Sequence, residues 1–307
     1  MQLPIGLEEL LVRGIKILQA HGFHPNFILL YDEAWMVGEL IGRTVEQASG
    51  NVAIGDWFVF SCDEGGGYSP GGPHRDRPMA DRASGFRDAA DHSAASSASS
   101  ASSSSAPQEP RPNYCSAWLA LTAATTENSC LYLVPKSHDA GYFTAGDDDV
   151  RAIAIGSVQA LPVEQGGLLV FSHRTVHWGS QVRDRSFAAP RIALSLAFAA
   201  PCFEPAYFDS KHLPCPPLGL RLGLAAGQLI QYRHLDPPHA RGPPPVHPHL
   251  SIPAPAASSD RASLRRHRHD LALYRRVFHA QKRFFCEEYF DKIASKAQFL
   301  QFSAAMT

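Results

Sequence analysis

Two residues of types that commonly bind metals stand two positions apart in the stretch HRDRP: His74 and Asp76. Residues i and i+2 of an extended chain point to the same side, so the imidazole and the carboxylate could reach one metal ion. A second histidine from a later strand would complete a set of two imidazoles and one carboxylate, which is typical of non-haem Fe(II) oxygenases. An isolated H-x-D pair is weak evidence, because the chain has 15 histidines and a loop salt bridge would also explain it.

The second histidine has two candidates, His173 and His177, in FSHRTVHWGSQ after the apolar stretch LLVFS. They lie four residues apart, so both side chains could face the same way on an extended chain. Arg191 follows at the start of RIALS. A buried arginine offers a bidentate fork that would suit the far carboxylate of a dicarboxylate co-substrate. The plainer alternative for Arg191 is a surface salt bridge at the start of a strand.

The segments around these residues predict a mainly β protein with flanking helices. Short stretches rich in β-branched and aromatic residues are bounded by Gly and Pro turns, as in a jelly roll or sandwich rather than a parallel sheet. Apolar residues at steps of three and four predict a helix over residues 6–20 and one or two helices over 260–300. The expected strands lie at 57–61 and within 114–138, 154–181 and 190–201.

Composition also divides the chain. From Ser93 to Ala106 every residue is serine or alanine, so residues 79–112 are predicted to be a disordered insertion. Its ends should lie close together, and deletion of residues 90–110 should be tolerated. We expect one domain over residues 1–210, interrupted by this insertion. We expect residues 211–307 to form an extension, with a Pro-rich loop at 236–257 and the helix at 260–300 packing on the core.

Charge and composition exclude some classes of protein. Lys and Arg total 28 against 29 Asp and Glu, so the protein lacks the strong positive charge of a dedicated nucleic-acid scaffold. No apolar run approaches the roughly 20 residues of a membrane span, and Glu8 and Glu9 stand where a signal peptide would be basic. Six scattered cysteines without a CxxC motif suggest reduced thiols. Without a clear peroxisomal signal either, a cytoplasmic protein is expected.

Five motifs occur in a fixed order: HRD, CSAWLAL, ENSCLYLVPKSH, HWGS and PRIALS. In this order the chain resembles the phytanoyl-CoA dioxygenase family over about residues 26–201, interrupted by the Ser/Ala insertion. The resemblance implies a double-stranded β-helix, a jelly-roll and cupin-like core. It also implies Fe(II) as the metal, 2-oxoglutarate and O₂ as co-substrates, and ascorbate as a reductant.

The resemblance also assigns roles to individual residues. It implies that His74, Asp76 and His177 are the iron ligands, with His177 favoured over His173, and that Arg191 pairs with the far carboxylate of 2-oxoglutarate. Further co-substrate contacts are implied for Trp118, Ser180 and Ser195, although Trp178 displaces Ser180 by one position from the family's His-Gly-Ser pattern. Halogenating relatives lack the carboxylate that Asp76 supplies, which favours oxygenation. A structural role is expected for His138 in PKSH, with Tyr142 and Phe143 at the mouth of the site.

The function expected from the resemblance is hydroxylation of a C–H bond in a small or lipid-like substrate, with release of succinate and CO₂. One alternative is an oxygenase that acts on a modified nucleobase, for which the basic residues of segment 265–283 leave room. Another is a non-catalytic metal-binding or interaction protein on the same fold. A hydrolytic zinc cupin is a third option, but it explains neither Arg191 nor the order of the motifs.

Overall fold

The computed structural model describes most of the chain. The described residues are 4, 6–21, 23–62, 72–78, 85–87, 110–144, 150, 153–179, 190–213, 215–233 and 271–306. The α-helices are α1 (Leu7–Ala20), α2 (Asp32–Ser49), α4 (Leu218–Gln231) and α6 (Glu287–Met306), and residues 271–280 are also helical. Short 3-10 helices are η1 (Pro25–Leu30), η3 (Lys136–His138), η4 (Ile155–Ser157), η5 (Ser210–His212) and η7 (Lys282–Phe284).

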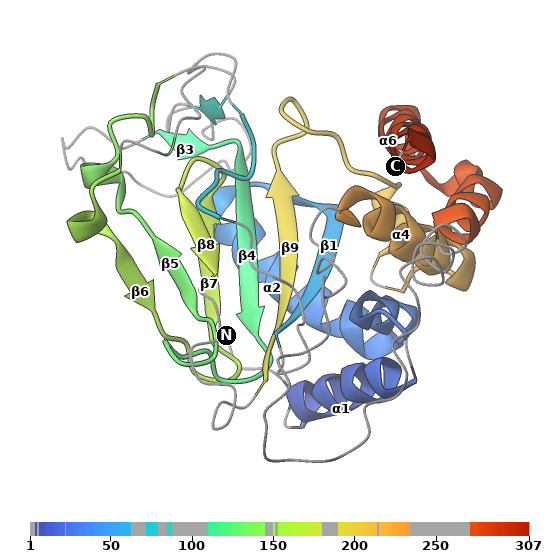
Figure 1. Ribbon diagram of the computed structural model, residues 1–307, viewed down its shortest axis with the longest axis horizontal. Coiled ribbons are helices and arrows are strands. Elements are labelled where there is room, and N and C mark those ends of the chain that lie inside the picture. Colours follow the sequence, from blue (N-terminus) through green and yellow to red (C-terminus); the bar gives the residue numbers. More distant parts are fainter. Residues whose placement is uncertain are drawn as a thin grey trace, which may run out of the picture.

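The strands form antiparallel sheets. They are β1 (Val52–Cys62), β2 (Phe86–Arg87), β3 (Arg111–Pro112), β4 (Tyr114–Ala120), β5 (Leu131–Leu133), β6 (Gln159–Leu161), β7 (Leu168–Ser172), β8 (His177–Gly179) and β9 (Arg191–Ala199). A four-stranded sheet has the order β1-β9-β4-β7, and a three-stranded sheet has the order β6-β5-β8. In Figure 1 the three-stranded sheet lies on one side of β4, and α4 and α6 lie on the opposite side, beyond β1.

Antiparallel sheets with flanking helices agree with the expected class, but the protein is mixed rather than mainly β. The four long helices have 14, 18, 14 and 20 residues, whereas the longest strand has 11. The difference arises because both ends of the chain are amphipathic and need a surface on which to bury their apolar faces. Among the described residues, no helix is both long and apolar enough to cross a membrane.

The N-terminal helices cover one face of the four-stranded sheet. The predicted helix at 6–20 is present as α1, which buries Leu7, Leu11 and Ile15 on one side. Helix α2 passes behind β9 and β1 (Figure 1) and stacks Trp35 on Trp57 of β1, with 4.3 Å between ring centroids. A Cβ atom on Gly38 would lie within 2.1 Å of the Trp57 ring, so only glycine allows this close approach.

Alternation along the strands separates that core from a cavity on the opposite face of the sheet. The side chains that point to the helices are apolar and include Trp57, Leu194, Leu196 and Leu119. Their neighbours in sequence point the other way and line the cavity: Asp56, Phe58 and Phe60 of β1, Arg191, Ser195 and Ala197 of β9, and Ser116 and Trp118 of β4. The four-stranded sheet is therefore the floor that positions the candidate site.

The C-terminal segments pack on the same core. Leu220, Leu224 and Ile230 of α4 are buried in the main hydrophobic cluster. Of the one or two helices predicted over 260–300, two are present within the described residues: residues 271–280 are helical, η7 follows, and α6 begins at Glu287. Between these two helices the rings of Phe278 and Phe290 stack with centroids 5.2 Å apart. The Pro-rich loop at 236–257 lies outside the described residues, and the domain boundary at 210 stays a prediction.

The edges of the expected insertion at 79–112 are structured, so its predicted boundaries were too wide. Phe86 and Arg87 pair with Pro112 and Arg111 as β2 and β3. The apolar ring of Phe86 is buried against Tyr142, so this part of the segment packs on the rest of the protein. Residues 79–84 and 88–109, which contain the Ser/Ala run, lie outside the described part of the chain.

Candidate metal and co-substrate site

His74, Asp76 and His177 come together at one end of the cavity. An isolated β-bridge joins His74 to His177, with N–O distances of 3.1 and 3.2 Å between their backbones. The Asp76 Oδ1 atom lies 3.8 Å from His74 Nε2 and 3.5 Å from His177 Nε2. The three donor atoms lie within 4.8 Å of one another, so this group could hold a metal ion. The H-x-D segment and the strand that carries His177 thus meet, as the resemblance implies.

The tautomers of the two histidines suit a metal. His74 Nδ1 lies 2.9 Å from the Gly72 carbonyl oxygen, and His177 Nδ1 lies 3.0 Å from the Thr175 carbonyl oxygen. A carbonyl accepts but cannot donate, so each Nδ1 carries the proton and each Nε2 presents a lone pair toward Asp76. Backbone contacts of this kind orient imidazole ligands in known metal sites. The donor set, two neutral imidazoles and one carboxylate, fits Fe(II).

The surroundings of the site lower the pKa values of the Asp76 carboxyl and the His177 imidazole. Burial raises the pKa of Asp76, but His177, the Ser116 hydroxyl, His74 and Arg77 together lower it below its ordinary value. Ser116 Oγ donates a hydrogen bond to Asp76 Oδ2 at a distance of 2.5 Å. Burial is also the largest influence on His177, and it lowers the pKa of that imidazole. Both shifts are in the direction that metal binding requires.

The arginines on either side of Asp76 fix the loop that carries it. Arg75 makes a buried bidentate pair with Asp139, at 2.7 and 2.9 Å, and so ties the loop to the segment after PKSH. Arg77 pairs with Asp56 of β1 at 2.9 Å and with Glu204 at 2.8 Å. Breaking a buried ion pair from one side typically costs about 3–5 kcal/mol, so these pairs hold the loop firmly.

Arg191 lies in the same cavity and is buried, with 2% of its surface exposed. Its Nη2 donates to Cys62 Sγ at 2.8 Å, and its guanidinium lies 5.5 Å from the centroid of the Trp118 ring. The buried Nε of Arg191 has no hydrogen-bond partner among the described residues. A buried, incompletely bonded guanidinium is costly unless an anion joins it, which fits a carboxylate ligand here. The surface salt bridge considered for Arg191 does not occur in the described structure.

The other expected co-substrate residues have different outcomes. Trp118 and Ser195 pair across β4 and β9 and both line the cavity. Ser180 lies outside the described residues, so its contact stays a prediction. Trp178, the residue that displaces it, also lines the cavity and stacks on Tyr132 with ring centroids 5.9 Å apart.

His173 is not part of the metal-binding group. It is fully buried, and its Nδ1 lies 3.1 Å from the Tyr114 carbonyl oxygen. Its ring packs between Phe86 and Phe203, and burial lowers its pKa to about 4. Its backbone carbonyl accepts from the Asp76 N–H at 3.1 Å. His173 therefore supports the site through its backbone and its packing.

The PKSH segment is followed by two aromatic residues that are expected at the mouth of the site. His138 lies in η3 and is exposed, and its Nδ1 is 3.1 Å from Ser137 Oγ. Tyr142 and Phe143 pack on Phe86 and are not among the described residues that line the cavity, so their place at its mouth stays a prediction. Strand β2 brings the Phe86 ring to them, which local sequence does not reveal.

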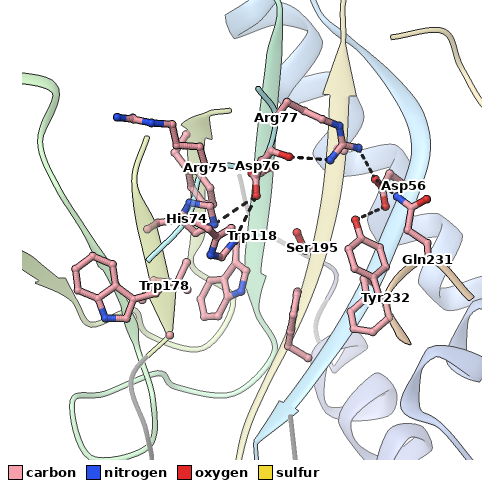
Figure 2. Close-up of a pocket in the computed structure, with 18 of the residues that line it drawn as sticks. Asp56, His74, Arg75, Asp76, Arg77, Trp118, Trp178, Ser195, Gln231 and Tyr232 are labelled. Atoms are coloured by element: carbon pink, nitrogen blue, oxygen red, sulfur yellow. Dashed lines mark hydrogen bonds and ion pairs between the residues drawn. The ribbon is translucent and has the colours of Figure 1, made fainter. Parts of the chain in front are cut away.

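The cavity has a volume of about 480 Å³. At one end are the candidate metal ligands, and at the other are residues that sequence reasoning missed, namely Asp56, Gln231, Tyr232, Lys292 and Lys296. Figure 2 shows His74, Asp76 and Trp178 on one side and Asp56, Gln231 and Tyr232 on the other, with Ser195 between. Tyr232 Oη donates to Asp56 Oδ1 at 2.7 Å. These residues come from β1, from the end of α4 and the residue after it, and from α6. They carry no motif, so no local signal could have identified them.

Several known proteins are similar to this chain. AviO1 from Streptomyces viridochromogenes Tue57 is 20% identical, with 49% of this chain and 52% of that chain covered and a TM-score of 0.34. The epimerase SnoN, solved with Fe³⁺, α-ketoglutarate and nogalamycin RO, is 18% identical over 64% of this chain and 75% of its own, with a TM-score of 0.38. The chain thus spans about half the length of AviO1. No curated protein sequence matches it.

The sequence profile of the phytanoyl-CoA dioxygenase (PhyH) family matches residues 37–187. This range contains the H-x-D pair, CSAWLAL, PKSH and the distal histidine, in the order that the motifs predicted. It ends before Arg191 and before all of the cavity residues from α4 and α6. Over residues 37–187 the sequence therefore matches the phytanoyl-CoA dioxygenase family.

Proposed function

We propose that the protein is an Fe(II)- and 2-oxoglutarate-dependent dioxygenase that hydroxylates a C–H bond of a small or lipid-like substrate and releases succinate and CO₂. The observation that carries the proposal is the group formed by His74, Asp76 and His177, whose donor atoms lie within 4.8 Å of one another beside a cavity that also contains buried Arg191. In this proposal the two sheets form the double-stranded β-helix core of a domain over residues 1–210, and residues 211–307 complete it.

In this proposal His74 Nε2, His177 Nε2 and an Asp76 oxygen hold the iron. When bound, the iron and 2-oxoglutarate would supply the oxidising chemistry, which belongs to the cofactor and not to the protein. The protein's part is to keep the donor atoms oriented. The carbonyls of Gly72 and Thr175 hold the two rings, and Ser116 holds the carboxylate.

Arg191 would bind the far carboxylate of 2-oxoglutarate with its guanidinium fork. Trp118 lies against that guanidinium and would flank the co-substrate, and Ser195 and Ser180 would contact it. Cys62 already takes one N–H of Arg191, so the remaining donors of the fork are oriented before the co-substrate arrives.

The apolar part of the cavity would hold the substrate and exclude water. Phe58, Phe60 and Phe171 line it, together with Trp178. A dry, mostly aromatic wall strengthens the electrostatic contacts inside the cavity and protects reactive species from side reactions. It also suits an apolar substrate body better than a strongly hydrated one.

The experiment is to incubate the purified protein with Fe(II), ascorbate and 2-oxoglutarate and to measure succinate formed without added substrate. Succinate formation that depends on iron is expected. His177→Ala should abolish both iron retention and turnover, whereas the control His173→Ala should keep its iron. A wild-type protein that retains iron but forms no succinate would favour a non-catalytic metal-binding protein. Loss of iron from His173→Ala alone would contradict the ligand assignment.

A further inference from the structure

Two lysines of α6 reach the end of the cavity away from the candidate metal ligands. Lys292 and Lys296 stand one helical turn apart, and both line the cavity. Lys296 Nζ contacts the carbonyl oxygen of Gln231, at the end of α4. Both lysines lie outside the residues that match the family profile, so this end of the cavity is a feature of the chain's own C-terminal segment.

The charges around the cavity leave Lys296 as a cation without a carboxylate partner. Arg75 pairs with Asp139, and Arg77 pairs with Asp56 and Glu204. Lys292 Nζ lies 3.4 Å from Glu204 Oε1. For Lys296, no carboxylate lies within ion-pair distance in the part of the chain that the structure describes. Burial and the neighbouring Lys292 lower the pKa of Lys296, and the more distant Asp56 carboxylate only partly opposes them, so a bound anion would stabilise the charged ammonium group.

Aromatic rings form the wall beside this cation. Phe58 packs against Phe60 with ring centroids 5.1 Å apart, and against Tyr232 with centroids 4.6 Å apart. Tyr232 directly follows Gln231, whose carbonyl holds Lys296. A molecule lying along these rings would have an apolar body and would end beside the ammonium group of Lys296.

We propose that Lys296, assisted by Lys292, binds a carboxylate or phosphate group of the substrate, whose apolar body lies along Phe58, Phe60 and Tyr232. The inference rests on the proposed function in one respect, namely that the bound anion is the substrate of the oxygenase. It narrows that substrate to an amphipathic anion and places the anion at the opposite end of the cavity from the iron ligands.

The test measures binding of matched probes by calorimetry to the protein loaded with Fe(II) and saturating 2-oxoglutarate, without oxygen. Saturating 2-oxoglutarate keeps the probes away from Arg191. One pair of probes is 4-phenylbutyrate and its uncharged amide; the other is 4-phenylbutyl phosphate and 4-phenylbutanol. The wild type should bind at least one anion about tenfold more tightly than its neutral partner, as expected for a charged hydrogen bond. The stronger pair identifies the anion as carboxylate or phosphate.

Variants assign the preference to the lysine. Lys296→Met should remove the preference for the anion and leave binding of the neutral probe unchanged, and Lys296→Arg should keep most of the preference. Lys211→Met, which removes an exposed lysine of η5, is the control and should behave as the wild type. Equal binding of anionic and neutral probes, or binding of neither, would overturn the inference, as would a preference that survives Lys296→Met.

The outcome is separable from the proposed function. Succinate formation without substrate is measured in the wild type and in Lys211→Met, whose exposed lysine lies outside the cavity and whose turnover should equal that of the wild type. A wild type that forms succinate but shows no preference for an anion would refute only the inference. A wild type that forms no succinate would refute the function, and the loss of anion preference in Lys296→Met would still decide the subsite.

Discussion

Replacement of Arg191 tests the co-substrate site most directly. The side chain is 2% exposed, its Nη2 donates to Cys62, and its Nε has no partner among the described residues. Such a guanidinium is desolvated whether or not an anion is present. Most of the binding free energy from a bound carboxylate would therefore come from a charged, bidentate contact in a low-dielectric environment.

The expected magnitude follows from that burial. Truncation of one partner of a desolvated charge pair typically costs about 2–5 kcal/mol, which corresponds to a loss of roughly 30-fold to several thousand-fold in affinity. Arg191→Ala should therefore weaken 2-oxoglutarate binding by this factor. Arg191→Lys should also bind poorly, because an ammonium group is a point charge that cannot reproduce the planar fork or the contact with Trp118.

The assay is an anaerobic titration of the Fe(II) protein with 2-oxoglutarate, followed by the metal-to-ligand absorption band. Iron content should be unchanged in both variants, since Arg191 is not part of the metal-binding group. Arg43→Ala, which removes an exposed arginine of α2, is the matched control and should titrate as the wild type. Wild-type affinity in Arg191→Ala with iron still bound would refute the co-substrate assignment and with it much of the proposed function.

Three further predictions concern the fold around the site. Deletion of residues 90–108 should leave the melting temperature and succinate formation near wild type, because Arg87 already pairs with Arg111 across the gap; a large drop in melting temperature would contradict this. Burial is the largest single influence on Glu204 and raises its pKa, but Arg77, Lys292 and the Tyr207 hydroxyl together lower it below its ordinary value, so Glu204→Gln should be less stable than the wild type near pH 7. In urea unfolding this difference should shrink as the pH falls below the ordinary value of 4.5, and a difference independent of pH would oppose the prediction. Arg75→Met should lower the free energy of unfolding by about 3–5 kcal/mol in urea titrations, since it leaves a buried carboxylate unpaired, and a change below about 1 kcal/mol would show that the pair is dispensable.

The sequence alone was sufficient to predict those features that depend on residues close together in the chain. Side chains two positions apart on an extended chain face the same side. The spacing of His74 and Asp76 was therefore enough to predict that their side chains could reach one metal ion. The helix at 6–20 followed equally from the period of its apolar residues. The order of the motifs identified the family, because the profile depends on residue types along the chain and not on their positions in space.

Other features required the tertiary structure, because they depend on contacts between distant segments. Spacing left His173 and His177 equivalent, and only the bridge between His74 and His177 groups the latter with Asp76. The contact of Arg191 with Cys62 spans 129 residues and exists because β9 pairs with β1. Lys296 reaches the cavity only because α6 packs on α4. This packing is driven by the burial of apolar side chains. It places only weak constraints on the polar residues of the helix, so the sequence pattern does not reveal which of them face the cavity.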